Sequence, residues 1–111
     1  MAVQANLLID QNADFLYTVT LIDSNNEAID LTGYSVYSQL RTSYTSNNYI
    51  DMNATINDPP TSGIITLSMA AGDTAMLTAT RYVYDLDVVS SNNITSRIMQ
   101  GIATINPGVT R

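Results

Sequence analysis

Acidic side chains are the groups in this sequence whose spacing first suggests chemistry. Asp10, Asn12 and Asp14 occupy the first, third and fifth positions of a calcium-binding loop. The rest of that motif fails, because Phe15 stands where the loop needs glycine and Leu21 stands where it needs a bidentate glutamate. We therefore interpret the segment as a plain loop between two strands, in which Asp and Asn side chains bond to nearby backbone groups.

A second acidic pair, Asp85 and Asp87, shares one face of an alternating segment. Paired carboxylates can act as general acid and base, but no other residue nearby in the sequence completes a catalytic site. A solvated strand face is the preferred interpretation. One of the two carboxylates could instead pair with Arg41 or Arg97 across strands.

The residue types on which most enzymes rely are missing. The chain has no Cys and no His, which excludes a thiolate nucleophile, an imidazole base and the usual zinc, haem and iron–sulfur ligands. It also has no Lys, which excludes a Schiff base and a P-loop lysine. We expect a protein that is not an enzyme, with no catalytic residue, no metal and no cofactor.

The charge pattern limits the class of partner. The net charge is −6, and the four cationic residues are far apart at Arg41, Arg81, Arg97 and Arg111. Binding to nucleic acid needs clustered cations, so we expect no nucleic-acid partner. No apolar run approaches 18 residues, and residues 1–10 lack the positive start of a secretory signal, so we expect no membrane partner either.

Alternating polar and apolar residues dominate the chain and predict half-buried strands. Clusters of Asp, Asn, Ser, Gly and Pro separate the alternating segments and predict short turns. Only residues 70–77 look locally helical, and Gly72 limits that helix to a turn or two. We expect one domain over residues 1–111, an all-β antiparallel β-sandwich of about seven strands. The predicted strands are Val3–Ile9, Asp14–Ile22, Tyr34–Thr42, Tyr49–Asn57, Ile64–Met69, Arg81–Val89 and Ile94–Ile105.

One local pattern narrows the type of sandwich. The apolar turn at Met76 and Leu77 is followed by a strand that carries Tyr82 and Tyr84. This resembles the tyrosine corner of immunoglobulin-like and fibronectin-like sandwiches, with Tyr82 at the matching position. The two tyrosines could form a stacking platform for a ligand, but aromatic residues on an alternating face usually fill the core. The pattern therefore favours an immunoglobulin-like sandwich.

The surface is short of charge. Charged residues make up 13% of the chain, about half the roughly 25% of an ordinary domain, and 35 of the 111 residues are Ser, Thr or Asn. Soluble monomers usually guard sheet edges with Lys, Pro or inward-pointing charges, and this chain offers few of these. We expect neighbouring copies or a larger assembly to cover some edges and faces. The segment from Ser43 to Tyr49 suits such an interface, with a flexible hairpin loop as the equal alternative; its candidate contact residues are Tyr44, Asn47, Asn48 and Tyr49.

Three segments together carry a resemblance: Asp30–Tyr34 with Gln39–Arg41, Arg81–Leu86, and Gly101 with Asn106–Arg111. In this order they resemble small virion structural proteins of tailed bacteriophages, especially those of cyanobacterial myophages. They are similar, more loosely, to the immunoglobulin-like N-terminal modules of phage baseplate proteins. The match runs from about Phe15 to Arg111. It consists of turns and strand faces and not of catalytic residues, so it reflects the fold.

The resemblance implies a non-enzymatic structural component of a virion. It would pack against copies of itself and against the capsid or the tail, neck or baseplate. Its motif residues have structural interpretations, since side chains of this kind order turns and open strands; they are Asp30, Thr32, Gly33, Arg81, Tyr82 and Tyr84.

The end of the chain and a competing function complete the expectations. Val109, Thr110 and Arg111 form a short tail that could reach a neighbour or could simply fray. The alternative function is a carbohydrate- or receptor-binding module, in which exposed Tyr44 and Tyr49 would stack on sugars.

Overall fold

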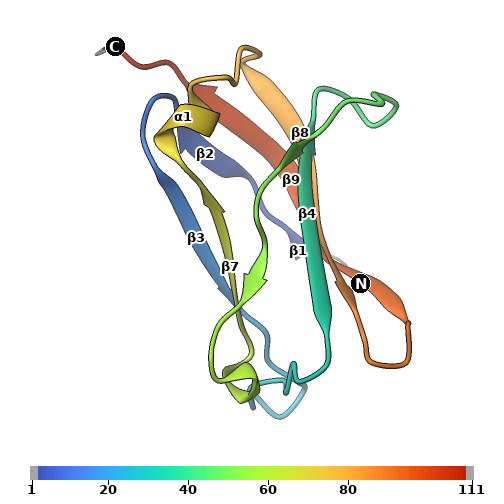
Figure 1. Ribbon diagram of the computed structural model, residues 1–111. Coiled ribbons are helices and arrows are strands. Elements are labelled where there is room, and N and C mark those ends of the chain that lie inside the picture. Colours follow the sequence, from blue (N-terminus) through green and yellow to red (C-terminus); the bar gives the residue numbers. More distant parts are fainter. Residues whose placement is uncertain (1–2, 110–111) are drawn as a thin grey trace.

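Two β-sheets face each other in the computed structural model, which describes residues 3–109 (Figure 1). The predicted all-β sandwich is confirmed. The larger sheet has the order β1-β9-β8-β4-β5, with β2 also beside β9, and the smaller sheet has the order β3-β7-β6. The strands are β1 (Val3–Gln4), β2 (Leu7–Asp10), β3 (Phe15–Thr20), β4 (Ser35–Arg41), β5 (Ile50–Asp51), β6 (Thr55–Ile56), β7 (Ile64–Met69), β8 (Arg81–Val89) and β9 (Thr95–Asn106).

Helical structure is limited to two short elements. The 3₁₀ helix η1 (Pro60–Ser62) lies before β7, and α1 (Ala71–Thr74) follows it, inside the segment where the sequence predicts a turn or two of helix. Within residues 3–109, neither element has the length or apolar character needed to cross a membrane.

The strand count and the strand directions differ in part from expectation. The predicted strand Val3–Ile9 is divided into β1 and β2 at Ala5 and Asn6, and both parts run parallel to β9. The sheet that contains them is therefore mixed. The predicted strand Tyr49–Asn57 is divided into β5 and β6, which gives nine strands in the described residues where the alternation predicts about seven.

Between β5 and β6 the chain crosses from the larger sheet to the smaller sheet. β5 pairs with β4 in the larger sheet, and β6 pairs with β7 in the smaller sheet. Between them, the backbone N–H of Met52 donates to the carbonyl of Ser38 (3.0 Å), and its carbonyl accepts from the N–H of Ser68 (2.9 Å). Met52 is fully buried, and Asn53 turns the chain with a positive φ of 50°. One residue thus joins the backbones of both sheets.

Alternate residues of the long strands face inward and form the core between the sheets. In β7 the inward side chains are Ile65, Leu67 and Met69, and in β8 they are Tyr82, Tyr84, Leu86 and Val88. Such two-residue periodicity follows from strand geometry. The alternation predicted for these two segments is therefore the alternation that the core uses.

Both tyrosines of β8 belong to this core. Tyr82 is buried, and its hydroxyl accepts a hydrogen bond from the backbone N–H of Ala79 (3.3 Å). This contact across the corner confirms the structural interpretation of the tyrosine corner. The buried Tyr84 hydroxyl donates to the carbonyl of Ala5 (2.5 Å), and burial, with a smaller effect of Tyr17, raises the pKa of Tyr84 to about 12.

The turn before β4 uses the motif residues as the sequence predicts. The backbone N–H and the hydroxyl of Thr32 both donate to the Asp30 carboxylate, at 3.0 and 2.6 Å. These two bonds lower the pKa of Asp30 below its ordinary value. Gly33 has a φ of 80°, which glycine adopts without steric cost. Tyr34 follows this turn and directly precedes β4.

At Gly101 in β9 the N-terminal segment lies close against the sheet. It lies opposite Tyr84 of β8. A Cβ atom at Gly101 would collide with the carbonyl oxygen of Ala5 and would lie 2.8 Å from its carbonyl carbon. The missing side chain therefore lets the Ala5 carbonyl lie over Gly101, where it accepts from the Tyr84 hydroxyl.

We predict that Gly101→Ala destabilises the protein by about 1–3 kcal/mol, because the new methyl group meets backbone that is already packed. The matched control is Gly72→Ala in α1, where a Cβ would have no neighbour within 4 Å. This second change should leave the stability unchanged or raise it by up to about 1 kcal/mol. Urea unfolding followed by circular dichroism measures both variants. Equal midpoints for the two variants would contradict the close approach at Gly101.

Candidate binding surface on the outer face of the larger sheet

A β-bulge sets which side chains face outward from β9. Its pairing with β8 shifts between Leu86 and Asp87, so Leu86 lies opposite Met99 while Asp87 lies opposite Arg97. Ile98 is the extra residue. Because one extra residue reverses the alternation, Arg97 and Gln100 face the same side although they are three positions apart. The bulge thus places Arg97 on the outer face, beside the acidic residues of β8.

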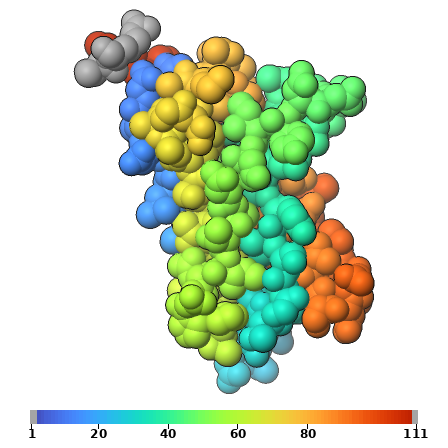
Figure 2. Space-filling model, in the orientation of Figure 1, coloured from blue at the N-terminus to red at the C-terminus, as the bar shows by residue number. Residues whose placement is uncertain are grey.

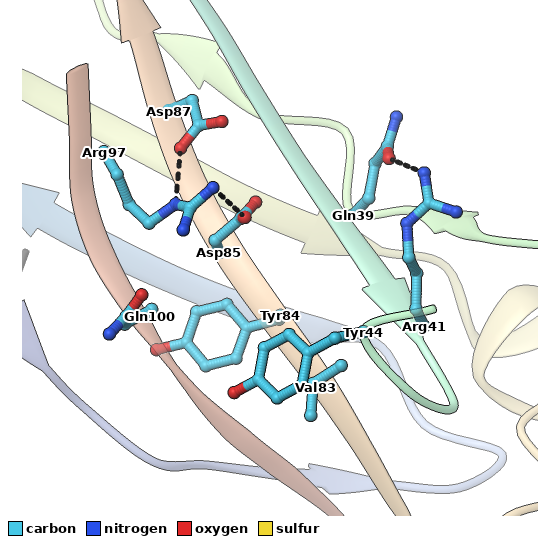
Figure 3. A pocket seen from close by; sticks show the side chains of 9 residues that line it. All are labelled: Gln39, Arg41, Tyr44, Val83, Tyr84, Asp85, Asp87, Arg97 and Gln100. Atoms are coloured by element: carbon cyan, nitrogen blue, oxygen red, sulfur yellow. Dashed lines mark hydrogen bonds and ion pairs between the residues drawn. The ribbon is translucent and has the colours of Figure 1, made fainter. Parts of the chain in front are cut away.

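Arg97 lies between the two carboxylates (Figure 3). Its Nη2 is 3.2 Å from Oδ2 of Asp85, and its Nε is 3.3 Å from Oδ1 of Asp87. Of the two interpretations that the sequence left open, the structure shows the cross-strand pairing, in which Arg97 contacts both carboxylates. All three side chains are partly exposed, and such pairs contribute roughly 0–1 kcal/mol to stability.

The pKa of Asp85 responds to its surroundings in this cluster. Burial raises the pKa of Asp85 above its ordinary value, and the neighbouring charge of Asp87 adds to this rise. Arg97 and, more weakly, Arg41 oppose it. The carboxylate of Asp85 is therefore a partly desolvated acceptor held beside a guanidinium, which is an arrangement that favours directional contacts with a partner.

Arg41 ties the loop of residues 42–49 to the same face. Its Nη1 donates to the carbonyl of Ser46 (2.6 Å), and its Nη2 donates to Oε1 of Gln39 (3.1 Å). The guanidinium also lies over the ring of Tyr49, 5.2 Å from its centre. These contacts fix the base of the loop and leave Tyr44 at its tip, with 80% of the residue surface exposed.

Arg41, Tyr44 and the cluster around Arg97 line an open hollow of about 270 Å³. Amide, carboxylate and guanidinium groups surround it, and an aromatic ring stands at its edge (Figure 3). Such planar groups can donate and accept hydrogen bonds in fixed directions. The lining residues are Gln39, Arg41, Tyr44, Val83, Tyr84, Asp85, Asp87, Arg97 and Gln100.

The structure brings part of the predicted interface together. Tyr44, Asn47, Asn48 and Tyr49 are all exposed on one loop, which projects from one end of the sandwich (Figure 2). Val109 is exposed and follows β9, whose end in Figure 1 lies on the other side of the sandwich from this loop. Thr110 and Arg111 lie outside the described residues. The loop and the chain end therefore offer two separate surfaces.

The first acidic segment forms the predicted loop between β2 and β3, but the expectation that Asp10 and Asp14 bond to nearby backbone groups is wrong, because both bond to residues far away along the chain. Asp14 accepts the backbone N–H of Ala71 at 2.8 Å, and Asp10 accepts from the side-chain amide of Asn106 at 3.0 Å. Over residues 3–109, no three His, Cys, Asp or Glu side chains form a group that could hold a metal ion. Arg81 is exposed at the start of β8 and does not contact the acidic cluster in an ion pair within this range.

Comparison with known proteins gives a distant match. Neither a family model nor a curated protein matches the sequence. Among solved structures, an internalin-like protein of Listeria monocytogenes is similar, with a TM-score of 0.50 and 18% identity. The alignment covers 95% of this chain but 28% of that one. This likeness shows the fold alone. A fold of this kind supports many functions, so the function must be argued from the surface.

Sequence reasoning missed Gln39 and Gln100 as members of this surface. Their place depends on the pairing of β4, β8 and β9 and on the bulge, which brings Arg97 into line with Gln100. One signal was present: both faces of residues 94–105 are partly apolar, which is what a break in the alternation produces.

We predict that Arg97→Gln raises the pKa of Asp85 further, because burial and the charge of Asp87 remain while the strongest opposing charge is removed. Titration of the side-chain carboxyl carbons by NMR measures the change. Arg81→Gln, on the same sheet at the start of β8, is the matched control. An unchanged or lower pKa of Asp85 in the Arg97 variant would show that Arg97 does not act on it.

Proposed function

We propose that this protein is a non-catalytic structural component of a tailed-phage virion, which packs on the capsid or on the tail, neck or baseplate. The proposal joins two lines of support. One is the resemblance of the turn and strand motifs, including Asp30–Tyr34 and Arg81–Leu86, to small virion proteins. The other is a surface whose composition is suited to contact with other proteins.

The observation that carries the proposal is the aromatic surface around Arg41. Tyr49 lies against the Arg41 guanidinium and exposes 53% of its surface, and Tyr44, which is 80% exposed, lines the same hollow as Arg41. Tyr and Arg are enriched at protein interfaces and often supply most of the binding energy, whereas Lys is depleted there. A chain without Lys that gathers tyrosines around an arginine is thus well suited to assembly.

The acidic cluster supports a binding role in preference to catalysis. Asp85 and Asp87 both contact Arg97, so the cation offsets part of their negative charge. A retaining or inverting pair of carboxylates needs an open space between the two groups for a sugar or a water molecule. In this cluster the guanidinium of Arg97 occupies that position (Figure 3).

We predict that the protein is retained in purified particles of the phage that encodes it, and that Tyr44→Ser reduces its occupancy. Loss of an exposed aromatic anchor removes apolar contact area at the interface centre. Ile94→Ser is the control, since Ile94 is a similarly exposed apolar residue in the turn between β8 and β9. Quantitative mass spectrometry of particles measures copy number relative to the major capsid protein. Absence of the protein from washed particles would refute the virion assignment.

The hollow on the outer face favours a second candidate, a carbohydrate-binding module. An exposed tyrosine beside planar amide, carboxylate and guanidinium groups is a combination that can stack on a sugar ring and bond its hydroxyls. Gln39, Gln100 and Tyr44 would make these contacts. The same surface could not easily bind a sugar and a protein at once, so the two candidates compete.

For this second candidate, we predict binding on a glycan array that is lost in Tyr44→Ala and retained in Ile94→Ser. The stacking ring is removed by the first change, while the second lies at another turn. Isothermal titration with the best glycan then gives the affinity of each variant. An array without any bound glycan would leave the virion assembly proposal as the one to pursue.

A further inference from the structure

Strand β3 is the longest open edge among the described residues. It pairs with β7 on one side, and no other strand within residues 3–109 pairs with its second side. β5 and β6, which lie at the far edges of the two sheets, have two residues each. In Figure 1, β3 forms one lateral border of the sandwich, and Figure 2 shows its blue atoms at the surface.

This edge lacks the usual protection. The sequence of β3 is Phe-Leu-Tyr-Thr-Val-Thr, without charge or proline, and its register with β7 continues without a shift from Phe15 to Thr20. Natural edges normally carry Lys, Pro, a bulge or an inward charge that prevents another strand from pairing. An uncharged and regular edge is therefore a template for strand addition.

The hydrogen bonds show which residues face the open side. Leu21 continues the register of β3, and its N–H donates to the carbonyl of Gly63 (2.7 Å), the residue opposite it. In an antiparallel pair, every second residue bonds to the same neighbour, so Val19, Tyr17 and Phe15 also direct their backbone groups to β7. The residues between them direct their N–H and carbonyl groups outward; they are Leu16, Thr18 and Thr20.

We propose that β3 pairs antiparallel with β3 of a second copy of this chain, with Thr18 opposite Thr18 of the other copy. In this register Leu16 lies opposite Thr20, and all three outward residues exchange their backbone bonds across the two-fold axis. The two smaller sheets then form one continuous sheet. The inference deepens the proposed function and rests on it for its biological setting, since it names a partner for an assembly protein.

Side-chain chemistry favours a second copy as the occupant of this edge. Asp14 comes to lie opposite Ile22, so the register places no two like charges opposite each other. Tyr17, which is 37% exposed, lies beside Val19 of the other copy, and Leu16, which is 70% exposed, lies beside Thr20. The pairing thus covers the large side chains that β3 leaves open. A charged or proline-rich segment would gain none of these contacts.

The absence of cysteine allows a direct test by a single disulfide. In the proposed register the two Thr18 Cα atoms are about 5.5 Å apart, within the roughly 4.4–6.8 Å range of disulfides. Two Thr20 Cα atoms are about 14 Å apart, because they are offset by four residues of about 3.3 Å each along strands that lie about 5 Å apart. Under mild oxidation, Thr18→Cys should yield on the order of tenfold more linked dimer than Thr20→Cys.

A second variant tests the pairing without a covalent bond. Thr18 is exposed, so Thr18→Lys should fold normally while it places two ammonium groups against each other. We expect sedimentation velocity to show a dimer for the natural sequence and a monomer for Thr18→Lys, with unchanged circular dichroism. Circular dichroism also identifies a variant that fails to fold, in which case the cysteine pair decides.

Three outcomes would overturn the inference: a natural protein that stays monomeric at high concentration, equal linking of the two cysteine variants, or a dimer that persists in Thr18→Lys. Each is measured on purified protein. The particle measurement with Tyr44→Ser tests the virion assignment separately. A monomeric protein that still occupies particles would reject the β3 pairing alone, and a dimer absent from particles would reject the virion assignment alone.

Discussion

The close approach of Ala5 to Gly101 is the contact on which the arrangement of strands depends. It lets the N-terminal segment dock on β9, where the hydroxyl of Tyr84 satisfies the Ala5 carbonyl. In immunoglobulin constant-type domains the first strand belongs to the opposite sheet, beside the second strand. Here β1 and β2 pair with β9, and β3 therefore keeps an open side. One glycine thus influences both the core and an edge on the other sheet.

The outer face of the larger sheet shows how a small irregularity creates a surface. If β9 kept Ile98 but alternated regularly without the bulge, Arg97 would lie two residues from the buried Met99 and face the core, where a guanidinium without a partner is costly. The bulge turns it outward to Asp85 and Asp87. Arg41 on β4 also orders part of this face, because it holds the loop of residues 42–49 by a hydrogen bond to the carbonyl of Ser46. Both arginines therefore organise the face on which the tyrosines are displayed.

Much of this fold could be predicted from alternation and turn chemistry. β7 and β8 lie where their patterns place them, and the Asp30 turn and the Tyr82 corner form the expected hydrogen bonds. These features are local, so neighbouring residues determine them. β3 and β7 pair antiparallel, as do β4 and β8, which agrees with the prediction. Each of their predicted segments forms one continuous strand.

The remaining features depend on contacts between distant residues. Alternation continues through Met52, so nothing in the sequence reveals that the strand changes sheets there. The parallel docking of β1 and β2 depends on Gly101, almost a hundred positions away along the chain. The members of the binding surface, such as Gln39 and Gln100, become neighbours only through pairing with β8. For these, the determining information is the register of strand pairs.

The backbone of Met52 has a consequence for how the sandwich comes apart. Because its N–H is bonded to Ser38 and its carbonyl to Ser68, neither sheet can separate from this residue without breaking a buried bond. Regions joined in this way exchange their amide protons together, as one cooperative unit. The two sheets therefore open as a single unit at this border, and the slowest-exchanging amides of the molecule should include those of Met52 and Ser68.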